Sequence, residues 1–388
     1  MEETKIYKFS ELCSKIGSGA TPKGGKESYL GGNIALIRSQ NVLDFNFSVD
    51  GLAYINNEQA QKLNNVSIEE NDVLLNITGD SVARACMAPS WILPARVNQH
   101  VAIIRGNADL VLNDYLLYFL QYKKSYLLSI SQGGATRNAL TKRMIEDIEL
   151  LLPNLSHQRK VVSILRSLDS KIELNRRIND NLEQQAQALF KSWFVDFEPF
   201  KGEKFVESQL GMIPKGWKVG TLSDLLDIRY GKDHKKLNDG NIPVYGSGGI
   251  MRLADGILYN GESVLIPRKG TLNNVLYVNW PFWTVDTMFY SIEKVPNVAK
   301  YCHLLLSKLD LASMNSGSAV PSMTTDILNK IQVIVANQDV FSSFNECISS
   351  LYLKAKINLD ENKRLSETRD LLLPKLMSGR LIIKDLHS

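Results

Sequence analysis

Two stretches of the chain place apolar or small residues at the alternating four-three spacing of a coiled coil. The first runs from Val161 to Trp193 and the second from Phe344 to Leu376. Adding one constant offset to the first set gives the second, and asparagines fall at matching seam positions in both; Arg369 is the one charged exception. The predicted helix-pair and subunit-interface residues are Leu165, Leu168, Ile172, Asn175, Asn179, Leu182, Leu189, Trp193, Ile348, Leu351, Asn358, Asn362, Leu365 and Leu372.

Antiparallel pairing of these stretches closes the seam in register. It sets Asn175 against Asn362 and Asn179 against Asn358, and it brings Trp193 beside Phe344. A seam asparagine pair costs stability but fixes register, and about thirty helical residues span about 45 Å. An ordinary amphipathic helical hairpin is the alternative. Proline inside a helix costs about 3 kcal/mol, so Pro374 leads us to expect that the outermost layer, Val161 with Leu376, does not form.

The sequence between the helical stretches shows a weak internal repeat. SELCSKIGSG from Ser10 resembles SDLLDIRYG from Ser223, and NDVLLNITG from Asn71 resembles ESVLIPRKG from Glu262. Strands are predicted over 72–77 and 97–105 and a helix over 113–128. Asn154 or Ser156 is expected to cap the first long helix and Pro199 to end it. We therefore predict an α+β chain with two similar α/β modules, two long antiparallel helices forming an intramolecular coiled coil, and a pseudo-twofold internal repeat.

The predicted boundaries follow from these patterns. They are a first module over 1–153, a central helical region over 154–198, a linker and second module over 199–336, and a distal helical region over 337–388. A chain of 388 residues is expected to form two or more domains. Hydrophobic residues at 44% and charged residues at 22% are typical of a soluble globular protein, and a net charge of +4 permits an anionic partner without requiring one.

The cysteines and the hydropathy of the sequence indicate the expected cellular compartment. The four cysteines are scattered and form no CxxC pair, so neither a disulfide framework nor a zinc site is predicted. No apolar run has the length of a signal peptide core or a membrane span. We expect a cytoplasmic protein with no membrane contact.

Several of these segments together resemble a known family. LSHQRKVVSILRSLDSKIELNRRINDNLEQQAQALFKSWFVDFEPF from Leu155, LGMIPKGW from Leu210 and LLLPKLMSGRL from Leu371 are similar to the specificity subunits of type I restriction-modification systems. The resemblance covers nearly the whole chain. It implies that each module is a target recognition domain for half of a split, asymmetric double-stranded DNA site, and that the helices dock two modification (methyltransferase) subunits.

The same resemblance sets the expected partners and cofactors. One copy of the chain is expected per complex, with restriction subunits (ATP-dependent translocase and nuclease) joining as well. S-adenosylmethionine, ATP and Mg²⁺ are expected on the partner subunits, and no cofactor or metal on this chain.

Base recognition uses Arg, Lys, Asn, Gln, Ser or Thr on loops that reach a groove. For any single residue of these types an ordinary solvated surface role is the competing interpretation. The candidate DNA-binding residues of the first module are Lys23, Arg38, Ser39, Gln40, Asn76, Thr78, Arg84, Arg96, Asn98, Gln99 and Arg137. Those of the second are Lys232, Lys235, Lys236, Tyr245, Ser247, Arg252, Arg268, Lys269 and Thr271.

Patterns that resemble catalytic motifs are incomplete. NWPF at Asn279 has Trp280 where an amino-methyltransferase motif has proline, and no glycine-rich cofactor turn accompanies it. In GSGATPKGGKE, Gly25 occupies the lysine position of a phosphate-binding loop. The five histidines show no metal-ligand spacing. We predict a non-enzymatic DNA-recognition subunit; the alternative is a non-DNA scaffold that grips protein through duplicated modules.

Overall fold

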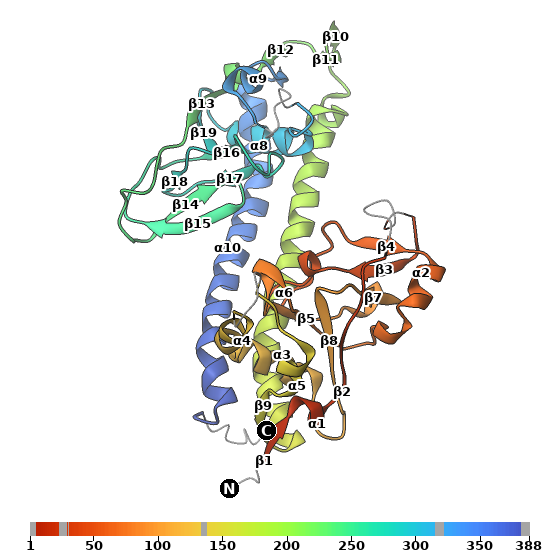
Figure 1. Cartoon of the computed structure of the whole chain (residues 1–388). Coiled ribbons are helices and arrows are strands. Elements are labelled where there is room, and N and C mark those ends of the chain that lie inside the picture. The colour runs from red at the N-terminus through yellow and green to blue at the C-terminus, as the bar shows by residue number, and fades with distance from the viewer. Residues whose placement is uncertain (1–4, 23–28, 30, 133–137, 315–321, 382–388) are drawn as a thin grey trace, which may run out of the picture. The chain divides into compact units, whose positions relative to one another are not determined.

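The computed structural model describes residues 5–22, 29, 31–132, 138–314 and 322–381. The chain divides into two compact units (Figure 1). The first unit holds Met1–Leu174 with Asp360–Ser388, and the second holds Asn175–Leu359. Each unit therefore combines one globular module with half of each long helix. The domain boundaries predicted from the sequence stay a prediction. The two compact units divide the chain within the long helices, so they do not test where each module ends.

The described part of the first module contains three small sheets. Strands β1 and β9 pair antiparallel, a four-stranded sheet has the order β2-β8-β5-β6, and a three-stranded sheet has the order β4-β3-β7 with β3 parallel to β7. The strands are β1 (Lys5–Lys8), β2 (Cys13–Ser18), β3 (Ile34–Ile37), β4 (Ala53–Ile55), β5 (Val73–Asn76), β6 (Ala85–Met87), β7 (Ala95–Val97), β8 (Val101–Gly106) and β9 (Glu149–Leu152). The helices are α1 (Phe9–Leu12), α2 (Asn57–Lys62), α3 (Asn113–Tyr122), α4 (Lys124–Ser131) and α5 (Lys142–Glu146). The predicted single helix over 113–128 is thus two helices that break at Lys123.

The second module repeats this topology. Strands β12 and β20 pair antiparallel, and the larger sheets have the orders β13-β19-β16-β17 and β15-β14-β18 with β14 parallel to β18. The strands are β12 (Lys218–Thr221), β13 (Leu226–Tyr230), β14 (Ile242–Gly246), β15 (Gly249–Ala254), β16 (Ser263–Pro267), β17 (Leu276–Val278), β18 (Trp283–Thr284), β19 (Met288–Glu293) and β20 (Gln332–Val335). The helices are α7 (Leu222–Leu225), α8 (Ala299–Lys308) and α9 (Thr325–Asn329), and a hairpin of β10 (Phe205–Ser208) and β11 (Gly211–Pro214) precedes the module.

Details outside the strands repeat as well. Gly79 and Gly270 follow equivalent strands and both have positive φ, 75° and 85°. The residues before them, Thr78 and Lys269, each form an isolated antiparallel bridge, with Ala139 and Ser322. The internal repeat predicted from the sequence is confirmed.

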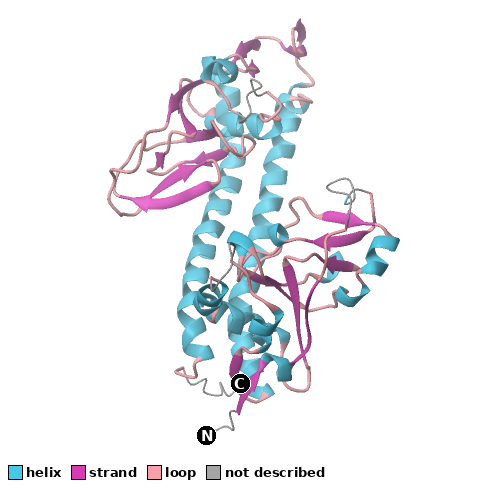
Figure 2. Ribbon diagram, viewed as in Figure 1, coloured by secondary structure: helices cyan, strands magenta, loops and turns pink. Residues whose placement is uncertain are grey.

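The four-stranded sheet of the first module separates two apolar cores. Val73 and Leu75 of β5 face a core shared with α3, while Leu74 between them faces a core shared with the β4-β3-β7 sheet. Strand side chains alternate between faces, so a strand buried on both sides is apolar throughout. This explains why DVLLNI carries no polar alternation. The sheets and the helices that cover them are distinguished by colour in Figure 2.

The long helices are α6 (Leu155–Phe194) and α10 (Gln338–Met377). Asn154 caps α6, because its Oδ1 accepts a hydrogen bond from the His157 amide at 2.9 Å. The expectation that Pro199 ends this helix is wrong. The amides of Val195 and Asp196 both donate to the Lys191 carbonyl, and Phe197 adopts a left-handed φ of 51°, so the helix ends before the proline.

Within the second unit, the two helix halves pair antiparallel in the predicted register. Asn358 Nδ2 donates to Asn179 Oδ1 at 2.8 Å, and the rings of Trp193 and Phe344 lie 5.6 Å apart. The pairing predicted for Asn175 with Asn362 joins residues of different units and stays a prediction.

Within the first unit, the helix pair continues past Pro374, contrary to our expectation. Val161 and Leu376 are both buried, at 0% and 2% exposure, in one apolar core. Proline removes one helix hydrogen bond, but burial of Leu376 and Met377 offsets that loss. The chain then leaves the helix at Gly379, whose φ of 70° suits a glycine cap.

Candidate nucleic-acid interface

One loop in the second module gathers the ends of several strands. This loop, Thr284–Thr287, follows β18. It accepts hydrogen bonds from the Lys232 amide at Thr284 (2.8 Å) and from the Arg268 amide at Thr287 (2.8 Å), and the Val285 amide donates to the Tyr245 carbonyl at 3.0 Å. The ends of β13, β14 and β16 therefore meet at one end of the module. The candidate DNA-binding residues that follow these strands are brought together there.

The side chains at this end are largely cationic. Arg268 donates from Nη1 to the Asp286 carbonyl at 3.2 Å, and its guanidinium lies 5.4 Å from the ring of Tyr230, which is 52% exposed. Ser247 is held nearby, because Asn274 Nδ2 donates to its carbonyl at 2.8 Å. The other exposed candidates are Lys232, Lys235, Lys236, Lys269 and Thr271. We call this end of the module the second loop surface.

The equivalent loop of the first module, Val97–His100, follows β7 and is bonded in the same way. The Asn98 amide donates to the Ile37 carbonyl at 3.0 Å, and the Ile77 amide to the His100 carbonyl at 2.9 Å. Its side chains form a polar chain: Thr78 Oγ1 lies 2.5 Å from His100 Nδ1, and Gln99 Nε2 lies 3.1 Å from His100 Nε2. We call this end the first loop surface.

The segment between β3 and β4 completes the first loop surface. Gln40 Nε2 donates to the Asp50 carbonyl at 3.0 Å, and the Arg38 guanidinium donates to the Gly51 carbonyl. The Ser39 carbonyl accepts from Asn76 Nδ2 at 2.9 Å. These bonds hold a long connection in one shape, while Gln40 stays exposed at its edge.

Five predicted DNA-binding residues are buried or have hydrogen bonds within the modules. Asn76, Asn98 and Tyr245 are buried. The guanidinium groups of Arg96 and Arg252 donate to the carbonyls of Ala60 and Leu237, at 3.2 and 2.7 Å. Burial requires the polar groups of Asn76, Asn98 and Tyr245 to bond internally, so we leave these three out of the proposed surface, while the half-buried Arg96 and Arg252 stay predictions. Arg84 is half-buried beside the first loop surface, and Lys23 and Arg137 lie outside the described residues.

Sequence reasoning missed other residues at these surfaces. Tyr230, His100, Ile250 and Met251 were not candidates. The strand pattern that ends at Gly231 indicated where β13 stops, but not that its last aromatic side chain packs on Arg268. The exposure of two apolar residues on β15 has no signal in the sequence.

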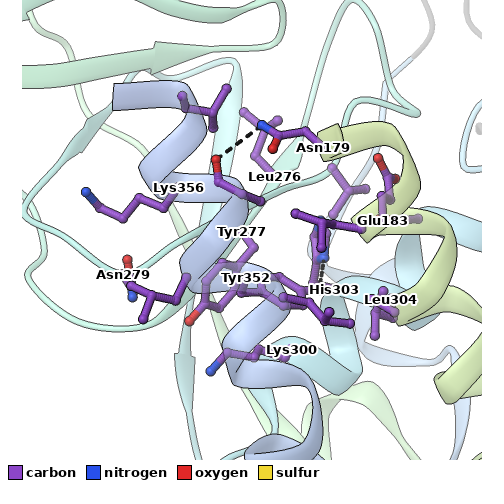
Figure 3. Close-up of a pocket in the computed structure, with 18 of the residues that line it drawn as sticks. Asn179, Glu183, Leu276, Tyr277, Asn279, Lys300, His303, Leu304, Tyr352 and Lys356 are labelled. Atoms are coloured by element: carbon purple, nitrogen blue, oxygen red, sulfur yellow. Dashed lines mark hydrogen bonds between the residues drawn. The ribbon is translucent and has the colours of Figure 1, made fainter. Parts of the chain in front are cut away.

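The second unit also contains a cavity of about 700 Å³ lined by segments of α6, α8 and α10 (Figure 3). His303 Nδ1 lies 2.7 Å from the Tyr352 hydroxyl. Burial lowers the pKa of His303 to about 4 and raises the pKa values of Tyr277 and Tyr352. Lys300 is buried and bonds to Glu262 and Asn345, at 3.1 and 2.8 Å. One part of the cavity wall is thus an uncharged aromatic cluster beside the Lys300–Glu262 ion pair, and Asp180, Glu183 and Lys356 also line the cavity.

Among the described residues, no group of three or more His, Cys, Asp or Glu side chains is placed to hold a metal ion. The described helices include none that is long and apolar enough to cross a membrane.

Comparison with known proteins identifies the family of the two modules. A family model described as the type I restriction modification DNA specificity domain matches residues 1–184 and 214–339, once over each module. The chain belongs to this type I restriction-modification specificity family. It is therefore a specificity subunit whose repeated modules are DNA target recognition domains.

Relatives of known identity agree with this assignment over nearly full length. The specificity subunit of the type I restriction enzyme MjaIX from Methanocaldococcus jannaschii is 28% identical over 416 residues, covering 98% of this chain and 94% of that protein. The HindI specificity subunit from Haemophilus influenzae is 25% identical over 440 residues, with 90% and 94% covered. The crystal structure of the type I restriction-modification system S subunit from M. genitalium has the same fold, with a TM-score of 0.52, 16% identity, and 97% and 96% coverage.

Proposed function

We propose that each module of this specificity subunit reads one half of a bipartite, asymmetric double-stranded DNA target. The proposal rests on one observation: the same hydrogen-bonded loop recurs at the same end of both modules, but it carries different side chains. A shared backbone presents both surfaces to DNA in the same way, while different side chains select different bases.

The charges on the second loop surface support DNA as the ligand. Lys232, Lys235, Lys236, Arg268 and Lys269 stand against the carboxylates of Asp233 and Asp286 in the same segments. A positive excess on exposed loops suits phosphate contacts. The first loop surface offers mainly amide, hydroxyl and imidazole groups, which suit base edges.

We further propose that α6 and α10 space the modules and dock two modification subunits. Apolar side chains stand exposed on α10, at Leu353 (60%) and Ile357 (45%) in the second unit and at Leu371 (66%) in the first. Apolar side chains exposed at helical spacing favour a protein partner. In this proposal methyl transfer with S-adenosylmethionine, and ATP- and Mg²⁺-dependent cleavage, belong to modification and restriction subunits that join one copy of this chain in the cytoplasm.

The test is the methylation pattern of a host that expresses this chain with its modification subunit. Arg268→Ala should weaken or relax recognition in one half-site only, and Gln99→Ala in the other, because a good base contact is worth about 1–3 kcal/mol. Lys204→Ala, an exposed lysine outside both loop surfaces, serves as the control. Equal changes in both half-sites from either variant would contradict the split-reader proposal.

The competing function is a protein-gripping scaffold. Duplex DNA binding distinguishes the two, because phosphate contacts release counterions and make affinity fall steeply with salt. A scaffold would show no duplex binding at low salt, even with modification subunits present.

A further inference from the structure

The hairpin of β14 and β15 exposes apolar side chains on the second loop surface. Ile250 is 60% exposed and Met251 is 59% exposed, on consecutive positions of β15. Strand β15 lies at the edge of its sheet and pairs only with β14 among the described strands. The pairing of β14 with β15 shifts register here, with Val244 opposite Arg252 and Tyr245 opposite Ile250, so Met251 is the extra residue of a β-bulge next to the hairpin turn. Packing within the module therefore leaves more than half of each of these two side chains exposed.

The hairpin turn is fixed to the cationic loops. A Cβ atom built on Gly246 would lie 2.4 Å from Met251 Sδ, so the glycine leaves the room that the methionine occupies. A Cβ atom on Gly270 would lie 2.6 Å from Ser247 Oγ, which places the turn against the loop that begins with Arg268 and Lys269. The turn next to Ile250 and Met251 therefore lies against the segment that carries Arg268 and Lys269.

We infer that Ile250 and Met251 read thymine methyl groups in the major groove of one half-site. This inference rests on the proposed function. The major groove admits a two-stranded β-ribbon, and the thymine C5-methyl is the apolar group displayed there. A protein partner fits less well, since protein interfaces are depleted in lysine and the surrounding segments carry five cations against two carboxylates.

Strands β3 and β4 of the first module are not joined in such a hairpin. They are connected by the long segment that includes Arg38, Ser39 and Gln40. The methyl contacts proposed for Ile250 and Met251 should therefore fall in one half-site, the one read by the second module.

The experiment uses the full chain and a library of random duplexes. Selection with the wild-type chain first defines the bound sequence. Each thymine is then replaced by deoxyuridine, which deletes only the C5-methyl. We expect one or two positions, all in one half-site, to lose about 3- to 5-fold in affinity, which corresponds to burial of one methyl group.

The same scan is repeated with the Ile250→Ala, Met251→Ala double variant, in which the deoxyuridine effect should fall below about 2-fold. Ile257→Ala removes a similarly exposed side chain (53%) of the same module and should leave the effect intact. A selected site without thymine in either half, no deoxyuridine effect, or an effect that persists in the double variant would each overturn the inference. If no duplex is selected at all, the proposed function itself fails.

Discussion

The two units attach their modules to the long helices at equivalent positions but with different chemistry. In the first unit, Asp169 of α6 accepts hydrogen bonds from Tyr118 of α3 at 2.7 Å and from Arg369 of α10 at 2.8 Å. In the second, the equivalent helix position is Tyr352, which bonds to His303 of α8, and Ala186 stands where the first unit has Arg369. The two junctions thus use equivalent backbone positions, but the side chains at those positions differ.

The difference has a physical consequence. The first junction is ionic and directional: the Arg369 guanidinium also lies 3.8 Å from the Phe45 ring. The second is uncharged as long as His303 stays neutral. We therefore expect the first to depend on its charge pair and the second on pH.

The largest effect should come from Arg369→Ala. Removing one member of a mostly buried ion pair leaves Asp169 without its counter-charge, at a cost of about 3 kcal/mol in the free energy of unfolding. Hydrogen exchange of the α3 amides reports the loss, with the α8 amides as an internal reference. Lys62→Ala, which breaks an exposed ion pair of the same unit at 73% and 77% side-chain exposure, should leave the free energy of unfolding nearly unchanged. Equal losses from both variants would contradict the ionic junction.

Acid should weaken the second junction selectively. Burial depresses the pKa of His303 from 6.5 to about 4, so the unfolded chain binds a proton in this window that the folded unit excludes. Stability from this group is complete above pH 6.5, falls by about 2 kcal/mol by about pH 5, and is lost further as the pH falls toward 4. His303→Gln should flatten that slope for the α8 amides and leave the α3 amides unchanged. An unaltered slope would mean that other groups control acid sensitivity.

Removing one tyrosine hydroxyl from each junction compares them directly. Tyr118→Phe deletes a hydrogen bond to a carboxylate and should cost about 2 kcal/mol, whereas Tyr352→Phe deletes a neutral one and should cost about 1 kcal/mol. Urea unfolding of the full chain, followed by hydrogen exchange in each unit, measures both. Tyr54→Phe, at a position 43% exposed, is the control for loss of a hydroxyl alone. The reverse order of the two effects would refute the contrast.

The sequence predicted the long helices and the repeated strands better than it predicted the residues of the two loop surfaces. Heptad spacing depends only on residues that are close in sequence. The long helices and the Asn179–Asn358 pairing could therefore be predicted from it. The similar segments NDVLLNITG and ESVLIPRKG correctly identified equivalent strands, because a buried strand is apolar in both modules. The partners of Asn76 are on Ser39 and Val42, far away in sequence, and no local pattern separates such a buried asparagine from one that faces a base. Pro374 misled for the same reason, since tertiary burial outweighed a local penalty.

The smallest expected effect concerns the two asparagines between the helices of the second unit. Asn358 donates to Asn179, and Asn179 donates in turn to the Ala355 carbonyl at 3.2 Å. Replacing both asparagines by leucine should raise the stability of the second unit by roughly 1 kcal/mol or less while weakening the preference for one register, because a buried asparagine pair is satisfied only when aligned.

Disulfide trapping distinguishes register from stability. In a Cys347→Ser background, cysteines at Leu182 and Ala355 should crosslink efficiently with the asparagines present. Cysteines at Leu182 and Ile348, one heptad away, should crosslink only after both asparagines are replaced. Asn181→Leu changes an exposed position of the same helix and should alter neither yield. If the shifted crosslink stays absent in the double leucine variant, the register is held by the modules, through junctions such as Tyr352 with His303, and the seam asparagines only reinforce it.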